Sequence, residues 1–218
     1  MYRWQKFCLS AVGVTIASLS VSFPATAVTL TFDDGVLNQQ FPNPAGIFIP
    51  SGYGGFDWNN MAVLDGGAIA NSGYNNAIVS IDNVAYNSGG GVTRIVRSDR
   101  SLFNFNSAYF TAAWNDGLQV RAQGYFKGTR IAELVFKVNT DTPLKQVLNF
   151  AGIDELWLSS FGGIKNPSLN PNGFGEQFAM DDFVYNEAIP KPQPIPVPAL
   201  LPGAIVWGLQ VVRKQKRK

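Results

Sequence analysis

The chain has 218 residues and a formal net charge of +2, and it contains no histidine and one cysteine, Cys8. Without an imidazole, it cannot form a Ser-His-Asp triad, a His-ligated zinc site or a histidine general base. Residues 28–187 hold nine basic and 15 acidic side chains, a net charge of −6, which argues against a nucleic-acid partner.

The first 27 residues have the organisation of a helical secretory signal peptide. Arg3 and Lys6 supply a positive region, residues 7–21 are apolar apart from Ser and Thr, and Ala25-Thr26-Ala27 forms a small-x-small cleavage site. We therefore expect residues 1–27 to be removed during export and the mature chain to begin near Val28. A retained amino-terminal helix is the alternative.

Residues 28–187 are predicted to form one all-β domain. Residues 117–126 and 129–138 alternate between apolar and polar side chains and are joined by Lys127-Gly128, which predicts a tight hairpin. Further strands are expected at residues 28–32, 77–81, 93–97, 108–113, 146–150, 155–161 and 177–185. Gly- and Asn-rich stretches separate them, and helical periodicity is missing. This pattern predicts an antiparallel two-sheet sandwich, with a jelly roll as the preferred topology.

Two acidic pairs stand at opposite ends of this domain, Asp33-Asp34 after the first strand and Asp181-Asp182 in the last. The first and last strands of a sandwich are often neighbours, so the pairs could meet. Adjacent carboxylates repel unless a cation joins them, and Ca²⁺ takes six to eight oxygen ligands. We expect a structural Ca²⁺ site formed by Asp33, Asp34, Asp181 and Asp182. The alternative is that these are ordinary exposed acids at strand ends.

The sequence of residues 178–185, Phe-Ala-Met-Asp-Asp-Phe-Val-Tyr, resembles the last strand of jelly-roll carbohydrate-binding modules. In such modules an Asp near this place ligates a structural calcium, so the resemblance also implies a calcium role for this strand.

A Gly-rich segment, residues 51–60, carries Tyr53, Phe56, Asp57 and Trp58. Aromatic rings stack on sugar C–H faces and carboxylates bond hydroxyl groups, so these four residues are candidates for polysaccharide binding. The alternative is that the rings plug one end of the sandwich, because large aromatic side chains are usually mostly buried. Trp114 and Trp157 are expected in the core or at its rim, and Arg94, Arg97 and Arg100 at solvated strand edges.

Catalysis without histidine would need two carboxylates at a defined separation, as in glycoside hydrolysis. Nothing in the spacing of the acids sets such a separation, so the sequence favours a non-enzymatic protein. A secreted carboxylate-dependent glycan hydrolase or lyase is the alternative.

The C-terminal segments follow one another in the order expected of a membrane anchor. Residues 188–198 form a Pro-rich linker, residues 199–212 carry no charge, and residues 213–218 contain five cations. A stiff spacer, a short apolar span and a basic tail are typical of an anchor whose end stays in the cytoplasm. Counted from Ile195, the apolar run would extend roughly 27 Å as a helix, against a hydrocarbon core of about 30 Å. A buried or amphipathic helix is the alternative.

Within this region Pro196, Val197, Pro198 and Ala199 precede Leu-Leu-Pro-Gly. The arrangement resembles the PEP-CTERM class of bacterial sorting signals, in the variant with a Pro-Thr-Pro-Ala motif, with Val197 at the usual position of Thr. The resemblance implies export through the inner membrane, recognition by an exosortase-type transpeptidase, and delivery to the cell envelope or the extracellular polymer. The sequence as a whole therefore predicts an exported protein, anchored in the envelope or released to the matrix, that binds polysaccharide or contributes to the matrix.

Overall fold

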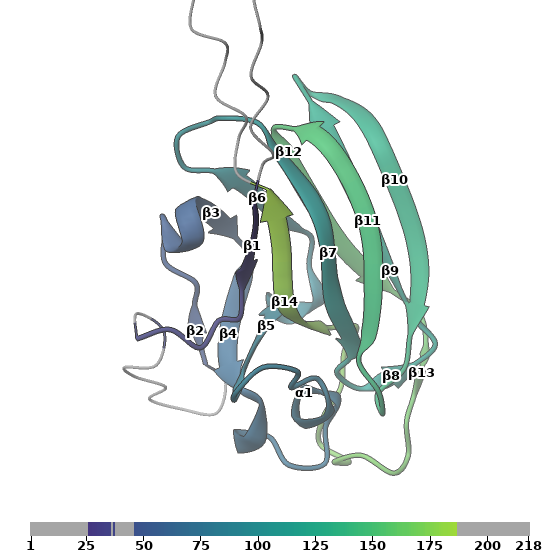
Figure 1. The fold of residues 1–218 in the computed structure, drawn as a ribbon. Coiled ribbons are helices and arrows are strands. Elements are labelled where there is room, and N and C mark those ends of the chain that lie inside the picture. Colours follow the sequence, from purple (N-terminus) through teal and green to yellow (C-terminus); the bar gives the residue numbers. More distant parts are fainter. Residues whose placement is uncertain (1–25, 36, 38–45, 187–218) are drawn as a thin grey trace, which may run out of the picture.

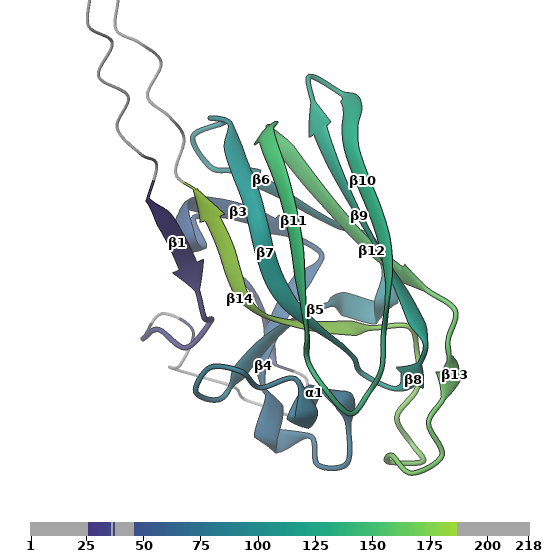
Figure 2. The same ribbon diagram turned by 45° about the vertical axis from the view of Figure 1, so that its right-hand side comes forward.

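The structure is a computed structural model that describes residues 26–35, 37 and 46–186. Two antiparallel sheets pack face to face in it (Figures 1 and 2). The larger sheet has the order β11 (Leu144–Ile153), β7 (Phe103–Ala112), β14 (Phe178–Asn186), β5 (Asn83–Asn87), β4 (Met61–Asp65) and β2 (Ile47–Phe48), with β1 (Ala27–Leu30) also paired to β14. The smaller has the order β10 (Thr129–Val138), β9 (Leu118–Phe126), β12 (Glu155–Phe161), β6 (Thr93–Arg97) and β3 (Phe56–Asn59). The prediction of an all-β antiparallel sandwich is confirmed, and the jelly-roll topology stays a prediction.

A few short elements complete the fold. Strands β8 (Asn115–Asp116) and β13 (Ile164–Lys165) pair with each other at one end of the sandwich. The helix α1 spans Gly73–Asn76, and its first turn is capped by the Ser72 hydroxyl, which accepts a hydrogen bond from the Asn75 N–H. Short 3₁₀ turns occur at Tyr53–Gly55, Gly66–Ala68 and Ser88–Gly90.

The core lies between the two sheets and is rich in phenylalanine. Phe56 of β3 is fully buried, and its ring lies 5.1 Å from Phe103 of β7 and 4.8 Å from Tyr185 of β14, both in edge-to-face geometry. Such pairs stabilise a core beyond the burial of their apolar area. The central strand β12 follows the period of two that this packing requires, since Leu156 and Leu158 are buried while Glu155 and Trp157 face outward and are half-buried.

The hairpin predicted at residues 117–138 is present as β9 and β10. Lys127 and Gly128 both have positive φ, 50° and 75°, which is the conformation of a type I′ turn, whose twist matches that of the flanking strands. Strands β6 and β12 have the predicted bounds, and β1, β7, β11 and β14 overlap their predicted ranges.

The prediction of a strand at residues 77–81 is wrong. These residues follow α1 as an irregular loop, and the backbone N–H groups of Val79 and Ser80 donate to the Asp181 carboxylate instead of to a neighbouring strand. Strands β3, β4 and β5 were also missed, as were the two-residue strands β2, β8 and β13. Residues 56–65 form β3 and β4, which lie in different sheets and are joined by Asn60 at φ 57°.

The two ends of the described sandwich meet. Ala27 in β1 pairs with Asn186 in β14, and this pairing lies at the end of the molecule opposite to α1, β8 and β13 (Figures 1 and 2). The predicted signal peptide, proline-rich linker, sorting motif, membrane span and basic tail lie almost wholly outside the described residues. Within the part that is described, no helix has the length and apolar character needed to cross a membrane.

Candidate functional site

Two of the four predicted calcium ligands, one from each acidic pair, lie around a single serine hydroxyl. Ser80 Oγ is 2.6 Å from Asp33 Oδ2, 2.8 Å from Asp181 Oδ1 and 3.1 Å from the Thr31 carbonyl oxygen. Asp33 is 9% exposed and Asp181 is fully buried. One hydroxyl has one proton to donate, so it cannot satisfy all three acceptors at once.

Backbone N–H groups hold both carboxylates in place. Asp33 Oδ1 accepts from the N–H groups of Asp82 and Asn83 at 3.0 and 2.8 Å. Asp181 Oδ2 accepts from Val79 and Ser80, each at 2.8 Å. Burial nevertheless raises the pKa of the Asp181 carboxyl, and these hydrogen bonds offset only part of that rise.

The other two predicted ligands have different surroundings. Asp34 is exposed and accepts a hydrogen bond from the Tyr53 hydroxyl. Asp182 is half-buried at φ 51°, and burial raises the pKa of its carboxyl while Lys145 lowers it. Among residues 26–35, 37 and 46–186, no group of three or more acidic, histidine or cysteine side chains is arranged to hold a metal ion.

The rings predicted to bind sugar are core residues, so this part of the prediction needs correction. Tyr53, Phe56 and Trp58 are 6%, 0% and 6% exposed, and the Trp58 indole donates to the Tyr53 carbonyl oxygen at 3.0 Å. A ring that is buried in the core cannot stack on a polysaccharide. The alternative interpretation, that these rings plug the sandwich, describes their position.

Asp57, the fourth member of that group, does face solvent. The hydroxyls of Ser51 and Ser98 donate to Asp57 Oδ1 at 2.5 and 2.9 Å, and an Arg100 guanidinium nitrogen lies 3.3 Å from Oδ2. The two serine hydrogen bonds, aided by Arg100, hold the pKa of the Asp57 carboxyl below its usual range.

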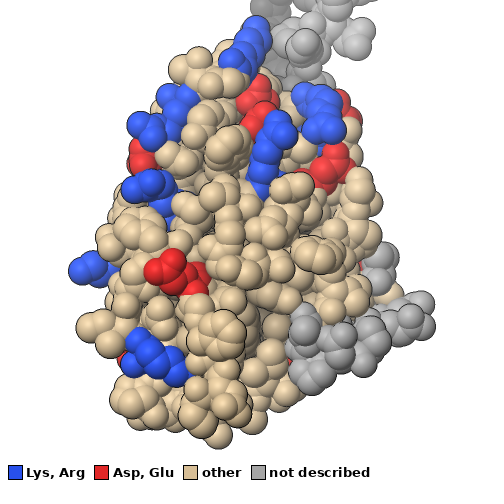
Figure 3. Space-filling view, turned by 180° about the vertical axis from the view of Figure 1, so that it is seen from behind, with Lys and Arg blue, Asp and Glu red and all other residues tan. Residues whose placement is uncertain are grey.

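Asp57 belongs to the outer face of the five-stranded sheet. Cross-strand pairing places one outward residue from each strand in a single row, in the order Asn59, Arg94, Trp157, Gln123 and Glu133. Four strand spacings make this row about 19 Å long. Tyr125, in the adjoining row, has its ring 4.9 Å from that of Trp157. Figure 3 shows the molecule from the side of this sheet, where Lys and Arg side chains with a few carboxylates among them lie across the upper part and along one edge, and most of the remaining surface is uncharged.

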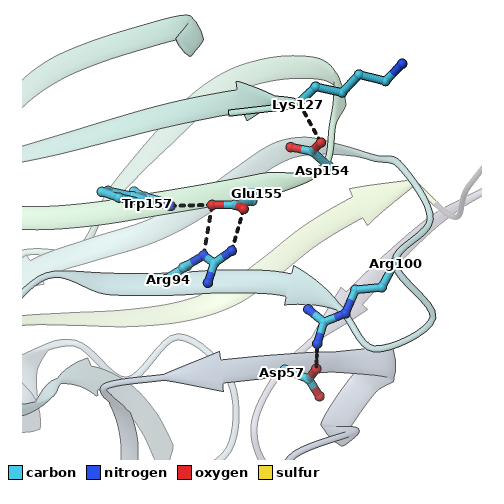
Figure 4. A network of polar contacts seen from close by, with 7 residues as sticks. All are labelled: Asp57, Arg94, Arg100, Lys127, Asp154, Glu155 and Trp157. Atoms are coloured by element: carbon cyan, nitrogen blue, oxygen red, sulfur yellow. Dashed lines mark hydrogen bonds and ion pairs between the residues drawn. The ribbon is translucent and has the colours of Figure 1, made fainter. Parts of the chain in front are cut away.

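The polar groups beside Trp157 are fixed by one another. Arg94 Nε donates to Glu155 Oε2 at 2.8 Å, a second guanidinium nitrogen donates to Oε1, and the Trp157 indole N–H donates to Oε2 at 2.9 Å (Figure 4). The Arg94 hydrogen bonds lower the pKa of the Glu155 carboxyl. The result is an ionised, two-point Arg–Glu pair that orients an aromatic ring at the surface.

One hollow adjoins this pair, and a second hollow adjoins the first. One, of about 450 Å³, is lined by Arg94, Val96, Arg100, Asp154 and Glu155. The other, of about 690 Å³, shares Arg100 and Asp154 and continues to Phe126 and Lys127. Asp154 Oδ2 accepts from the Lys127 backbone N–H at 2.7 Å, whereas Asp154 Oδ1 has no hydrogen-bond partner among the described residues. The two hollows thus share Arg100 and Asp154, and the first is lined by the Arg94–Glu155 pair that contacts Trp157.

Comparison with known proteins gives only distant likenesses. No family model and no curated protein matches the chain. Among solved structures, a family 61 carbohydrate-binding module in complex with β-1,4-galactotriose is 9% identical, with 67% of this chain and 97% of that chain covered and a TM-score of 0.35. The K2 cleaved adhesin domain of Lys-gingipain is 8% identical, with 74% and 99% covered and a TM-score of 0.41. Our argument for a function therefore depends on the surface itself.

Of the residues on this face, sequence analysis assigned only Asp57 to ligand binding, because it placed Trp157 in the core or rim and the arginines at solvated edges. A signal was present, since the polar positions of residues 119–125 and 155–159 alternate with buried ones. The missing information was the pairing, which brings β12 between β9 and β6.

Proposed function

We propose that this chain is an exported, non-enzymatic β-sandwich protein that binds polysaccharide along the outer face of its five-stranded sheet. The observation that carries the proposal is the row from Asn59 to Glu133, in which Trp157 stands between Arg94 and Gln123, with the Arg94–Glu155 pair beside its ring. Sugars are bound by such sets, because the ring packs on C–H groups while guanidinium, carboxylate and amide groups exchange hydrogen bonds with hydroxyls.

A carboxylate-dependent hydrolase or lyase is the competing function, and the same face favours it less. Glycoside hydrolysis needs one carboxylic acid whose pKa is raised so that it can protonate the leaving group. Glu155 has the opposite property, since Arg94 lowers its pKa. The missing histidine removes the usual alternative acid.

Export, the signal peptide, the membrane span and exosortase-type processing belong to the same proposal. The support for them is the order of segments at the two ends of the sequence. A destination in the envelope or the extracellular polymer would place the binding face where polysaccharide is abundant.

The binding test uses the full-length chain in a sugar-free detergent, with soluble and insoluble envelope polysaccharides. We expect retention without new reducing ends, and about a fivefold weaker affinity for Trp157→Ala, since ring packing is worth roughly 1 kcal/mol. Tyr109→Ala is the matched control, because Tyr109 is half-exposed on the other sheet beside Lys145. Retention that Trp157→Ala leaves unchanged would contradict the assignment of the face, and release of reducing ends would favour the hydrolase.

We also propose that Asp33 and Asp181 bind a structural Ca²⁺ together with the Thr31 carbonyl oxygen. The proposal is supported by two buried carboxylates and a carbonyl that converge on one hydroxyl proton. These oxygens would supply part of the shell that Ca²⁺ needs, and water would supply the remainder.

The calcium test is a comparison of melting temperatures. We expect Ca²⁺ to raise the melting temperature relative to a chelator, because an ion bound only by the folded state stabilises it. Asp33→Asn should lose this response. Asp34→Asn, which changes the exposed neighbour bonded to Tyr53, should keep it. An equal melting temperature with Ca²⁺ and with chelator would refute the proposed Ca²⁺ site.

A further inference from the structure

A third hollow lies at the other end of the sandwich from the paired residues Ala27 and Asn186. It has a volume of about 240 Å³ and is bounded by the segment around α1 and by the loop that leads into β14. Its lining consists of aromatic rings, two apolar side chains, two amides and one glycine, namely Tyr74, Tyr86, Trp114, Phe174, Leu64, Ile69, Asn172, Gln177 and Gly173. None of these lining residues is charged.

The aromatic wall of this hollow is fixed in place. The Tyr74 ring meets the rings of Tyr86 and Trp114 edge to face, with centroids 5.4 and 5.7 Å away. Lys165 lies with its ammonium nitrogen 4.7 Å from the Trp114 ring centroid and donates to the carbonyl oxygens of Asn170 and Gly173. A Cβ at Gly173 would come within 2.0 Å of the Trp114 ring, so this glycine allows the loop to lie directly on the indole. A hollow held in this way is formed before any ligand arrives.

Two side chains that line the hollow have ring surface or hydrogen-bonding capacity that the fold does not use. Phe174 is 81% exposed, so its ring contributes little to the core. Gln177 Oε1 is buried and has no hydrogen-bond partner among the described residues. A buried acceptor without a donor is costly. Because Oε1 is closed to solvent, the Gln177 side chain must turn to present it to the hollow, where a ligand hydroxyl would remove this cost.

We propose that this hollow binds one neutral sugar unit, such as the terminal residue of a glycan chain. The sugar ring would pack on Phe174 and donate a hydroxyl to Gln177 Oε1 once this side chain has turned toward the hollow. The volume, below that of typical drug-sized sites, suits one pyranose ring, and the uncharged lining suits a neutral sugar. The inference rests on the proposed function for its ligand class only. It adds a second site, at a distance from the row that contains Trp157.

The test is saturation-transfer NMR with the full-length chain in a sugar-free detergent and the methyl glycosides of glucose, galactose and mannose. We expect at least one of these glycosides to bind with a millimolar dissociation constant. Phe174→Ala and Gln177→Leu should each weaken it about tenfold or more, and Trp157→Ala should not. Phe174→Ala alters an exposed side chain, so loss of folding does not complicate its result.

The possible outcomes separate the two sites. No transfer to any of the three glycosides, or equal binding by Phe174→Ala, overturns this inference while leaving polysaccharide retention through Trp157 as a separate result. Unchanged or tighter glycoside binding by Gln177→Leu would show that Gln177 accepts no sugar hydroxyl and would also overturn the inference. Glycoside binding that Trp157→Ala abolishes would leave one site only, on the sheet. If the unaltered chain does not retain polysaccharide, the proposed function is refuted, whatever the result with the glycosides.

Discussion

The surroundings of Asp181 in the fold shift the pKa of its carboxyl. Its side chain is fully buried next to Asp33, and burial raises the pKa of its carboxyl. A carboxyl whose pKa is higher in the folded state than in the unfolded state stabilises the fold fully below the unfolded value, about 3.9. That contribution is lost as the pH rises through the folded value.

We therefore expect the stability of the chain in chelator to fall, relative to Asp181→Asn, as the pH is raised from about 4 towards neutrality. The comparison with Asp181→Asn cancels the carboxyls whose pKa is lowered, such as Asp57 and Glu155. Thermal unfolding of both proteins over this pH range is the measurement. Parallel profiles would show that Asp181 titrates alike in the folded and unfolded chains.

Single residues also show where sequence patterns are ambiguous. Tyr53, Phe56 and Trp58 stand in a Gly-rich stretch that resembles a surface loop, yet they are buried. Trp157 stands in a regular strand and faces solvent. Ring type and local composition do not decide between core and surface, because that depends on which face of which sheet the residue occupies.

Among the elements, the β9–β10 hairpin was the one most fully predictable from sequence. Its strands alternate along their length and its turn residues, Lys127 and Gly128, adopt the positive φ that the hairpin needs. All the information lies within about 20 neighbouring residues, which is why a local pattern predicts it.

Gly128→Ala should lower the free energy of unfolding by about 1 kcal/mol, because a left-handed conformation costs a side chain roughly that amount. A Cβ at this position would meet no atom within 4 Å, so the backbone strain is isolated from any clash. Urea unfolding would measure the loss as a shift in midpoint at constant slope. Lys127→Asn is the control, since Asn tolerates this conformation, and its midpoint should be unchanged or higher.

Other elements could not be predicted locally. The loop at residues 77–82 has a strand-like composition, but its N–H groups bond to Asp33 and Asp181, which are distant in sequence. Strands β3 and β4 follow one another with only Asn60 between them and enter different sheets. In both cases the deciding contact is long-range.

For the whole molecule, composition and turn spacing were sufficient to predict the antiparallel sandwich. They could not predict strand order, and hence not the row across five strands that forms the proposed binding face. The meeting of Asp33 with Asp181 could be anticipated only in outline, from the expectation that first and last strands are neighbours. The pairing of β1 with β14 provides that proximity.

At the same scale, deletion of residues 213–218 should change membrane retention or processing. Those residues contain five cations, and cations next to an apolar span resist translocation and keep that end in the cytoplasm. Cell fractionation of the truncated chain is the measurement. A chain with Arg in place of each tail Lys, which preserves the charge, should behave as the original. Identical fractionation of truncated and complete chains would count against the anchor.

The nine-residue strand β14 starts directly after Gln177 and ends at Asn186, beside Ala27. If the chain is tethered through the segment after Asn186 and holds a glycan at the far hollow, tension would run along the axis of this strand. Pulling in that direction loads the backbone hydrogen bonds to β7 and β5 in shear, together, and does not peel them apart one by one. The sandwich would then resist a sustained pulling force between a cell and the polymer around it.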